Sequence, residues 1–510
     1  MRRRTTSSTE AAAVVVAFVA LVASCVTPTP GTTDGVAPVP VGKIAVDATC
    51  AVIVDVDDAA ARGNLVPRRH DYEVAAVGDR HAAFGAMYAL PTNEARFRAF
   101  HAEVLQTPTS SVGAFGECLV YASWPKMGPE SQRACDKAAL GLGTSAVLVE
   151  VARVDSAIVH DADSAAAVAV AEAALKRAPG CSALHVARAR AIALAGDLVA
   201  SRAAWAAASA AAPKCFRCLV EQAALEERLD TGPAGRAAAA TLWERALALA
   251  PDHADTLRRF AAVTAGVDDA RALRAWEAAI KFGARDYPTL LAAARLSTSL
   301  ASTPSDYDAA MALARRAADA ARQDPEPRRL LIESAMKKGA LDEAVAAANA
   351  VLALVPDDVL ANATVARVAV ARGATGDAVA GYDAAVAALD GGASFDLAGA
   401  TALRAEQRGL LERLGVDDAK RPGGNVNAVA NKVQRALQNL WRDRIKKKGV
   451  TKGGVIVVVV ETNTDGSVAS AVVKADAVGD VEVAAAAVAW LHRATIAGGA
   501  RRHTLEFTLQ

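Results

Sequence analysis

The residues of this chain that are best suited to chemistry are its cysteines. Cys215 and Cys218 enclose two residues in the stretch CFRC, a spacing found in redox disulfides and in zinc sites. With Cys181 as a third ligand, a zinc site would still need a fourth, and no histidine falls at a matching spacing. A catalytic disulfide normally sits in a strand-helix-strand context. We therefore expect structural disulfides or buried thiols, with metal binding and redox chemistry as the alternatives.

Other sequence motifs of catalysis do not occur. The eight histidines are scattered, and none forms an HExxH metal site. There is no GxSxG nucleophile elbow and no GxxxxGK[ST] phosphate loop. The acidic run at residues 55–58 lacks the ligand spacing of a calcium loop. We expect a protein that is not an enzyme and uses no metal or cofactor; the alternative is an enzyme hidden in residues 41–145.

The first residues have the layout of an export signal. Three arginines at positions 2–4 precede an apolar run from Ala11 to Ser24. The run has 14 residues, fewer than the roughly 20 that a membrane-spanning helix needs. The stretch VASC, which ends at Cys25, resembles the lipobox of bacterial lipoproteins. That resemblance implies cleavage after residue 24 and a diacylglycerol on Cys25, with a plain secretory signal and an uncleaved anchor as alternatives.

The residues that follow Cys25 predict a tether and a location. Residues 25–42 are rich in proline, threonine and glycine and cannot bury a core, so we expect a flexible tether. Val26, in place of an aspartate, resembles lipoproteins sent to the outer membrane, which implies a protein that faces the periplasm. In that oxidising compartment the six remaining cysteines permit three disulfides. The possible pairs are Cys118 with Cys135 and Cys215 with Cys218.

The composition predicts helices and argues against nucleic acid as a partner. The net charge is only +1, and no basic tract is long enough to follow a phosphate backbone. The chain is 53% hydrophobic but only 4% aromatic, because alanine supplies most of its apolar residues. Alanine is the best helix former and allows close helix contacts. We therefore expect packed helices over most of the 510 residues.

One pattern repeats at an interval of 34 residues. GALDEAVAAANAVLALVP begins at Gly339, and GATGDAVAGYDAAVAALD begins at Gly373. Small or aromatic residues recur at offsets 5, 9 and 12 from each glycine, which places them on one face of a helix. The glycine turns the chain before that helix, and Pro356 stops the helix in the first unit. Each unit is therefore a helix, a tight turn and a second helix.

This frame resembles the tetratricopeptide repeat, a helical hairpin of about 34 residues. Trp205, Trp243 and Trp276 stand at the aromatic position of earlier units, whereas residues 305–325 fit the frame poorly. We count six or seven repeats between about 145 and 415, with a non-repetitive helical bundle as the alternative. The resemblance implies a solenoid, because one hairpin cannot bury its apolar face alone. Cys181 and Cys215 would then be neighbours on adjacent turns.

The resemblance also implies a binding groove. The first helices of the units would line a concave wall, and such walls bind extended peptides or helices of other proteins. The inward-facing positions in this frame are Arg329, Glu333, Lys337 and Arg367. These residues are our candidates for protein binding, although a solvated helix face explains the same charges.

The C-terminal residues 425–510 have a different pattern. A helical stretch is followed by a β-branched run, a turn at Asp465 and Gly466, a second strand, a helix and a last strand. This order, with Trp490 near the helix end, resembles the TonB C-terminal-like fold, in the version found in gliding-motility proteins. The resemblance implies that a partner strand pairs with a sheet edge. The candidate edge residues, which are otherwise only structural, are Thr504, Leu505, Glu506, Phe507 and Thr508.

The N-terminal residues 43–144 match no fold. KIAVDATCAVIVDVDD suggests a strand and NEARFRAFHAEVLQ a helix, in a small α+β subdomain or an irregular cap. The fold class expected for the chain is mainly α, a tetratricopeptide-type helical-hairpin solenoid with a small C-terminal α/β domain. The expected parts are a signal peptide at 1–24, a tether at 25–42, an unassigned region at 43–144, the solenoid at 145–415 and the terminal domain at 425–510.

Together these features favour a lipid-anchored scaffold of the bacterial envelope. The solenoid would bind a helix or peptide, the terminal domain would bind a second protein, and the lipid on Cys25 would hold the protein to a membrane. The alternative is a component of an energy-coupling or gliding-motility machine, in which the TonB-like domain transmits force.

Overall fold

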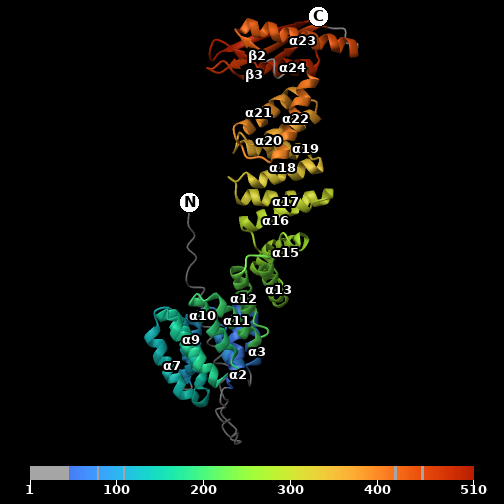
Figure 1. Cartoon of the computed structure of the whole chain (residues 1–510). Helices are drawn as coiled ribbons and strands as arrows, with labels where there is room; N and C mark the ends of the chain where they lie inside the picture. Colours follow the sequence, from blue (N-terminus) through green and yellow to red (C-terminus); the bar gives the residue numbers. More distant parts are fainter. Residues whose placement is uncertain (1–44, 77–79, 107–109, 418–421, 449–452) are drawn as a thin grey trace, which may run out of the picture.

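The computed structural model describes residues 45–76, 80–106, 110–417, 422–448 and 453–510. The molecule is mainly helical and elongated, with a group of N-terminal helices at one end and a three-stranded sheet at the other (Figure 1). Cys25, the leader and the tether lie outside the described residues. Within the described part of the chain, no helix is both long enough and apolar enough to cross a bilayer.

The N-terminal region is a group of helices that packs against the first repeats. The expected strand is wrong, because Val46–Ala61 forms helix α2. Its buried residues Cys50, Ile53 and Val54 recur at helical spacing, and their contacts with α10 outweigh the strand preference of β-branched residues. The helix expected at residues 93–106 is confirmed as α5. The further helices are α3 (Leu65–Ala75), α4 (Arg80–Tyr88), α5 (Asn93–Gln106), α6 (Ser111–Ser123) and α7 (Gly128–Leu142).

A solenoid of helical hairpins of the tetratricopeptide type follows. Helices α8 and α9 precede six hairpins, from α10/α11 to α20/α21, and α22 comes after them. Each helix packs mainly on the one before it and the one after it, so the hairpins stack in a single row. The elements are η1 (Gly143–Leu148), α8 (Val149–Ser156), η2 (Ala157–Asp161), α9 (Ser164–Arg177), α10 (Ser182–Leu194), α11 (Leu198–Ala211), α12 (Phe216–Leu229), α13 (Pro233–Leu249), α14 (Ala254–Thr264), α15 (Asp269–Lys281), α16 (Tyr287–Leu300), α17 (Pro304–Ala320), α18 (Glu326–Lys338), α19 (Leu341–Leu352), α20 (Val359–Ala371), α21 (Thr375–Asp390) and α22 (Leu397–Arg413).

The repeat frame coincides with these hairpins. Gly339 follows the first helix of its unit with a φ of +82°, a conformation that strains any residue with a side chain. Ala344 and Ala348 of α19 are fully buried, which lets neighbouring helices approach closely. The segment at 305–325 that fits the frame poorly is still the second helix of its hairpin, α17.

The C-terminal module has the helix and strand order expected from the sequence. Three of its strands form an antiparallel sheet in the order β3-β2-β5, and both helices of the module contact that sheet; the two-residue strands β1 and β4 pair in parallel beside it. The central strand β2 buries Ile456, Val458 and Val460 on one face. The elements are β1 (Gly423–Gly424), α23 (Val426–Lys448), β2 (Gly454–Thr462), β3 (Val468–Asp476), α24 (Val481–His492), β4 (Thr495–Ile496) and β5 (Arg502–Leu509).

Helix α24 fixes this module to the solenoid. Its residues from Val483 to Leu491 are all buried, and it contacts both the sheet and α21 of the last hairpin. One continuous apolar core therefore includes α20, α21, α22 and the terminal sheet. A polar joint strengthens the contact: Arg493 donates two hydrogen bonds to Asp383 of α21, at 2.7 and 3.0 Å. Gln407 of α22 donates to the same carboxylate at 2.6 Å.

Candidate protein-binding surfaces

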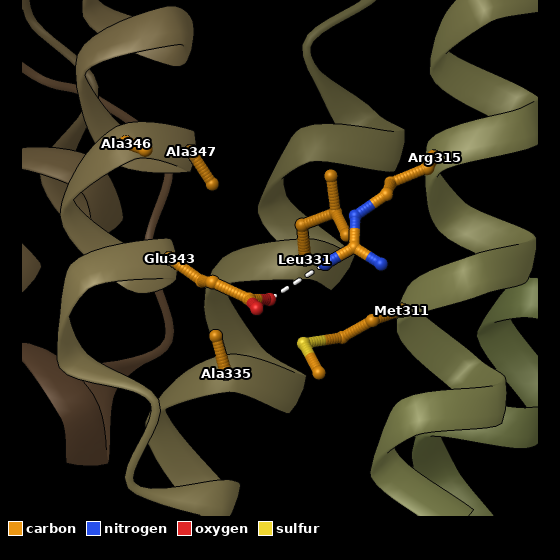
Figure 2. A pocket seen from close by; sticks show the side chains of 7 residues that line it. All are labelled: Met311, Arg315, Leu331, Ala335, Glu343, Ala346 and Ala347. Atoms are coloured by element: carbon orange, nitrogen blue, oxygen red, sulfur yellow. Dashed lines mark hydrogen bonds and ion pairs between the residues drawn. The ribbon is translucent and has the colours of Figure 1, made fainter.

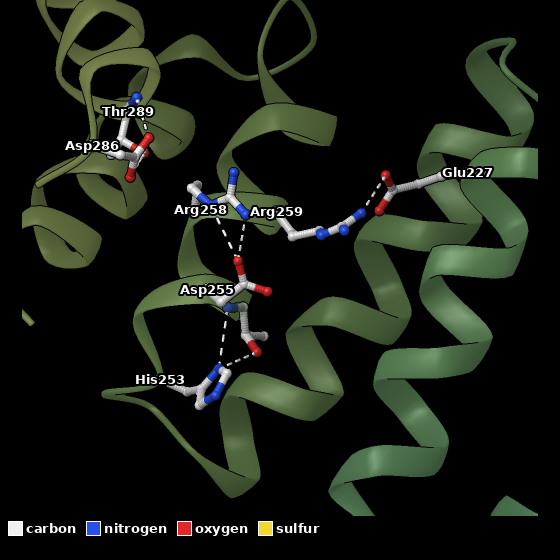
Figure 3. Close-up of polar contacts among 8 residues, drawn as sticks. Glu227, His253, Asp255, Arg258, Arg259, Asp286 and Thr289 are labelled. Atoms are coloured by element: carbon white, nitrogen blue, oxygen red, sulfur yellow. Dashed lines mark hydrogen bonds and ion pairs between the residues drawn. The ribbon is translucent and has the colours of Figure 1, made fainter. Parts of the chain in front are cut away.

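Ion pairs run along the solenoid from one first helix to the next. Arg259 of α14, for example, has its Nη1 atom 3.7 Å from Oε2 of Glu227 on α12 (Figure 3). We call this series the charge ladder. Its pairs are Glu227–Arg259, Arg295–Glu326, Arg329–Asp358 and Arg367–Glu406.

Between α14 and α16 a helix cap takes the place of a ladder ion pair. Asp286 is the N-cap residue of α16 and accepts hydrogen bonds from the backbone and side chain of Thr289. Burial works to raise the pKa of Asp286, but these hydrogen bonds and the charge of Arg258 outweigh it, so its pKa lies below the ordinary value. Arg258 itself pairs with Asp255 on its own helix at 2.5 Å (Figure 3). Asp286 is therefore ionised at neutral pH, and the charge of Arg258 on α14 acts on it without a direct ion pair in the described structure.

Three of the predicted groove residues lie on α18. Arg329 donates from Nε and Nη2 to Oδ2 of Asp358, at 2.8 and 2.6 Å. Asp358 is buried and is also the N-cap residue of α20. Lys337 donates to Glu333 at 2.7 Å on the same helix. Arg329 therefore connects one repeat to the next, while Glu333 and Lys337 form an exposed pair within one helix.

The fourth predicted groove residue, Arg367, has the most elaborate contacts. Its Nε and Nη2 atoms donate to the two carboxylate oxygens of Glu406 on α22, at 2.9 and 3.0 Å. The hydroxyl of Tyr382 donates to Glu406 as well. Burial, followed by this bond to Glu406, raises the pKa of Tyr382 to about 12. At all four positions the charge is already neutralised within the chain, so a partner could use these residues only by exchanging one ion pair for another.

Sequence reasoning missed two hollows that open between successive second helices. Figure 2 shows one of about 180 Å³ between α17 and α19, with Leu331 of α18 behind it. Met311, Ala346 and Ala347 supply much of its apolar lining. Arg315 donates to Glu343 across it at 2.6 Å (Figure 2).

A second hollow, of about 490 Å³, has the same construction near the other end of the solenoid. It lies between α9 and α11, with Val168, Ala169 and Ile192 among its lining residues. Arg188 and Glu172 form an ion pair at 2.8 Å in its wall. Each hollow thus combines apolar lining with a charged pair. The only sequence feature that points to these hollows is the alanine content of their helices, and the same feature also indicates close helix packing.

The predicted edge strand, β5, lies at the edge of the sheet. It pairs with β2 on one side only, and the side chains of Leu505 and Phe507 point into the core. In an antiparallel pair, every second residue points its backbone N–H and C=O groups away from the neighbouring strand. Thr508 is such a residue, because both of these groups bond to the side chain of Gln434 and not to β2. By the same alternation the backbone groups of Thr504 and Glu506 face outward.

The six described cysteines form three disulfides. Cys118 is bonded to Cys135 and Cys215 to Cys218, with Cα–Cα distances of 4.6 and 5.3 Å. Cys181 is bonded to Cys50, 131 residues away, and not to Cys215. The repeat frame could not reveal this pairing, since it involves a helix outside the repeats. Among the described residues no cluster of side chains could hold a metal ion.

A buried polar cluster also joins α2 to the solenoid and was not foreseen. Asp58 accepts hydrogen bonds from the backbone N–H groups of Phe216 and Arg217 at the start of α12, at 2.5 and 2.9 Å. Its neighbour Asp57 accepts from Tyr88 at 3.2 Å. Burial, followed by the negative charge of Asp155, raises the pKa of Asp57 to about 6. This cluster stabilises the N-terminal helices on the first repeats and faces no cavity described here.

Comparison with known proteins adds only distant structural likeness. No model of a known protein family matches the chain, and no curated protein is similar to it. Among solved structures it is similar to YrrB, a TPR protein with an unusual peptide-binding site, at 17% identity over 36% of this chain and 91% of YrrB, with a TM-score of 0.32. A tetratricopeptide repeat protein from Parabacteroides merdae is 15% identical over 50% of this chain and 91% of its own, with a TM-score of 0.30. The pilF protein of Pseudomonas aeruginosa is 16% identical over 46% and 97%, with a TM-score of 0.29.

Proposed function

We propose that the protein is a lipid-anchored scaffold of the bacterial envelope, which holds two kinds of partner protein at a fixed separation. The observation that carries this proposal is the joint between the solenoid and the terminal module. Because α24 shares a core with α21 and Arg493 bonds to Asp383, surfaces on the two parts keep a constant distance. A rigid body with separate binding surfaces is what a scaffold requires.

The first surface is the series of hollows along the second helices. Their apolar lining favours a partner that inserts a leucine-sized or aromatic side chain beside an ion pair such as Arg315–Glu343. The second surface is the outward edge of β5, where Thr504 and Glu506 offer backbone donors and acceptors to an extended strand. The charge ladder, by contrast, contributes to the stiffness of the solenoid.

The disulfides support a location outside the cytoplasm. All six described cysteines are paired and buried, and such bonds persist in oxidising compartments. This agrees with the export signal and with attachment through Cys25. The anchor is tested by the intact mass of the protein from host membranes beside a Cys25→Ala variant. A diacylglycerol increment that the variant lacks supports it, whereas an unmodified protein cleaved elsewhere refutes it.

The scaffold function is tested by cross-linking partners in the native envelope and identifying them by mass spectrometry. Ala346→Trp fills the hollow between α17 and α19, and Asn349→Trp is its control, at an exposed position of the same helix that does not line the hollow. Thr504→Pro removes an outward N–H group from β5 without breaking a bond to β2, and Thr504→Val is its control.

A scaffold should lose one set of partners with Ala346→Trp and a different set with Thr504→Pro. Both control variants should retain the full set. The proposal fails if neither variant changes the set, or if each variant loses every partner together with its control.

A second candidate function is supported by the same joint. The rigid contact would transmit a pull from β5 to the solenoid, as a component of an energy-coupling or gliding-motility machine with a TonB-like module would need. Loosening the joint with Arg493→Met separates the two functions. A scaffold should keep both partner sets, although their separation would vary, whereas a force transducer should keep its partners and lose the process that it drives.

A further inference from the structure

Helix α23 carries an unusual concentration of positive charge. Its 23 residues include seven lysines and arginines but a single acid, Asp443, in a chain with a net charge of +1. Residues 425–510 as a whole contain twelve lysines and arginines against seven acids. The positive charge is thus concentrated in the terminal module and, within it, on one helix.

Four of these cations lie on one exposed face. Lys432, Arg435, Arg442 and Lys446 follow one another at intervals of three, seven and four residues, so they form a straight row about 21 Å long. The core-facing side of the helix is separate and contains Val433, Leu437 and Trp441, all buried. We call the four exposed residues the cationic row.

The cationic row differs from the charge ladder in its partners. Each ladder arginine has a carboxylate of another helix within 4 Å. In the cationic row, Lys432 donates to the carbonyl of Gly423 and Arg435 to the carbonyl of Asn431 on its own helix. Among the described residues, no acid pairs with any member of the row. Among the described side chains of α23, Arg444 has an acidic partner, Glu482 of α24.

We propose that the cationic row binds the surface of an anionic phospholipid bilayer. The row lies on α23, at the end of the molecule opposite α2 and α3 (Figure 1), and its four side chains are exposed. Because the four exposed cations form one straight row, a flat charged surface can contact all of them at once. The row contains no aromatic residue on which a nucleic acid base could stack.

The physical basis is electrostatic attraction to lipid headgroups. Clusters of four or more lysines and arginines on a helix face are typical of anionic membrane binding, and each cation contributes about fivefold to partitioning. Removing three of them should therefore weaken binding by roughly a hundredfold. The attraction should also fall as salt rises, because the charges are fully exposed. This inference is independent of the lipid on Cys25.

The test uses the chain from Val26 onward, which contains every described residue and no lipid attachment site. Binding is measured by co-sedimentation with phosphatidylcholine vesicles, with and without about 30% phosphatidylglycerol, at about 0.05 M and about 0.5 M KCl. The variant replaces Arg435, Arg442 and Lys446 with glutamine. The matched control replaces three exposed solenoid arginines with glutamine, Arg274, Arg285 and Arg322, and so removes the same net charge.

We expect the protein to bind anionic vesicles and not neutral ones. High salt and the α23 variant should both abolish this binding, whereas the control variant should retain it. Equal weakening in both variants would overturn the proposal, because net charge alone would then explain binding. The absence of vesicle binding would also overturn it. Soluble polyglutamate that binds the row while vesicles do not would point to an acidic protein partner instead.

Discussion

The joint between Arg493 and Asp383 gives the sharpest test of how the terminal module is held. We expect Arg493→Met, which keeps an unbranched apolar side chain but removes the guanidinium charge, to loosen α24. The side chain of Arg493 is 8% exposed and that of Asp383 is 27% exposed. Removing one partner of a fully buried ion pair costs about 3–5 kcal/mol. Because Asp383 is partly hydrated and keeps its bond from Gln407, we reduce this to about 2 kcal/mol.

The assay is hydrogen exchange, followed by mass spectrometry of peptides from α21 and α24. A loss of about 2 kcal/mol corresponds to roughly 30-fold faster exchange where the helix opens locally. The matched control is Arg404→Met, which breaks a pair with Asp390 between two exposed side chains and should change exchange less than about twofold. If α24 exchanges at the same rate in Arg493→Met as in the control, the joint does not hold the module and our reasoning is wrong.

Three further predictions concern the N-terminal helices and the repeat. Asp58→Ala removes the acceptor at the start of α12 and should lower the free energy of unfolding by about 2 kcal/mol, measured by urea denaturation; an unchanged midpoint would contradict the assignment. Because burial raises the pKa of Asp57 to about 6, the folded protein keeps a proton that the unfolded chain has already released, so stability falls as pH rises from about 4 to about 6 and stays lower above that range. Asp57→Asn should therefore stabilise the protein by about 1–2 kcal/mol at neutral pH and have little effect near pH 4. An equal effect on the free energy of unfolding at both pH values would contradict the raised pKa of Asp57. Gly339→Ala should cost about 1 kcal/mol in thermal unfolding because of its positive φ, and a neutral result would show that the turn tolerates a side chain.

The repeats could be predicted because their evidence is local. The offset of Ala344 and Ala348 from Gly339 specifies a helix after a left-handed turn, and both features depend on neighbouring residues only. The helix and strand order of the terminal module follows from local patterns in the same way. The strand expected at residues 43–58 is wrong. Val52, Ile53 and Val54 are β-branched and favour a strand, but contacts of this segment with α10 favour a helix.

Features that depend on distant parts of the chain could not be predicted. Cys181 pairs with Cys50 across 131 residues, and nothing near either cysteine indicates the other. The repeat frame predicts that Arg329 and Arg367 face inward, but it does not indicate their acidic partners. These partners lie 29 and 39 residues away on the next helices. The hollows were missed because an alanine that leaves space and an alanine that fills it look the same in a sequence.

The most direct test of the scaffold function is whether one molecule holds both kinds of partner at once. A partner that is lost with Thr504→Pro would be tagged in the host, its complexes isolated after cross-linking, and their protein content determined. We predict that these complexes contain a partner of the hollows, and that this partner disappears from them in a strain that carries Ala346→Trp. If the two kinds of partner never occur in the same complex, the protein does not join them and the account is contradicted.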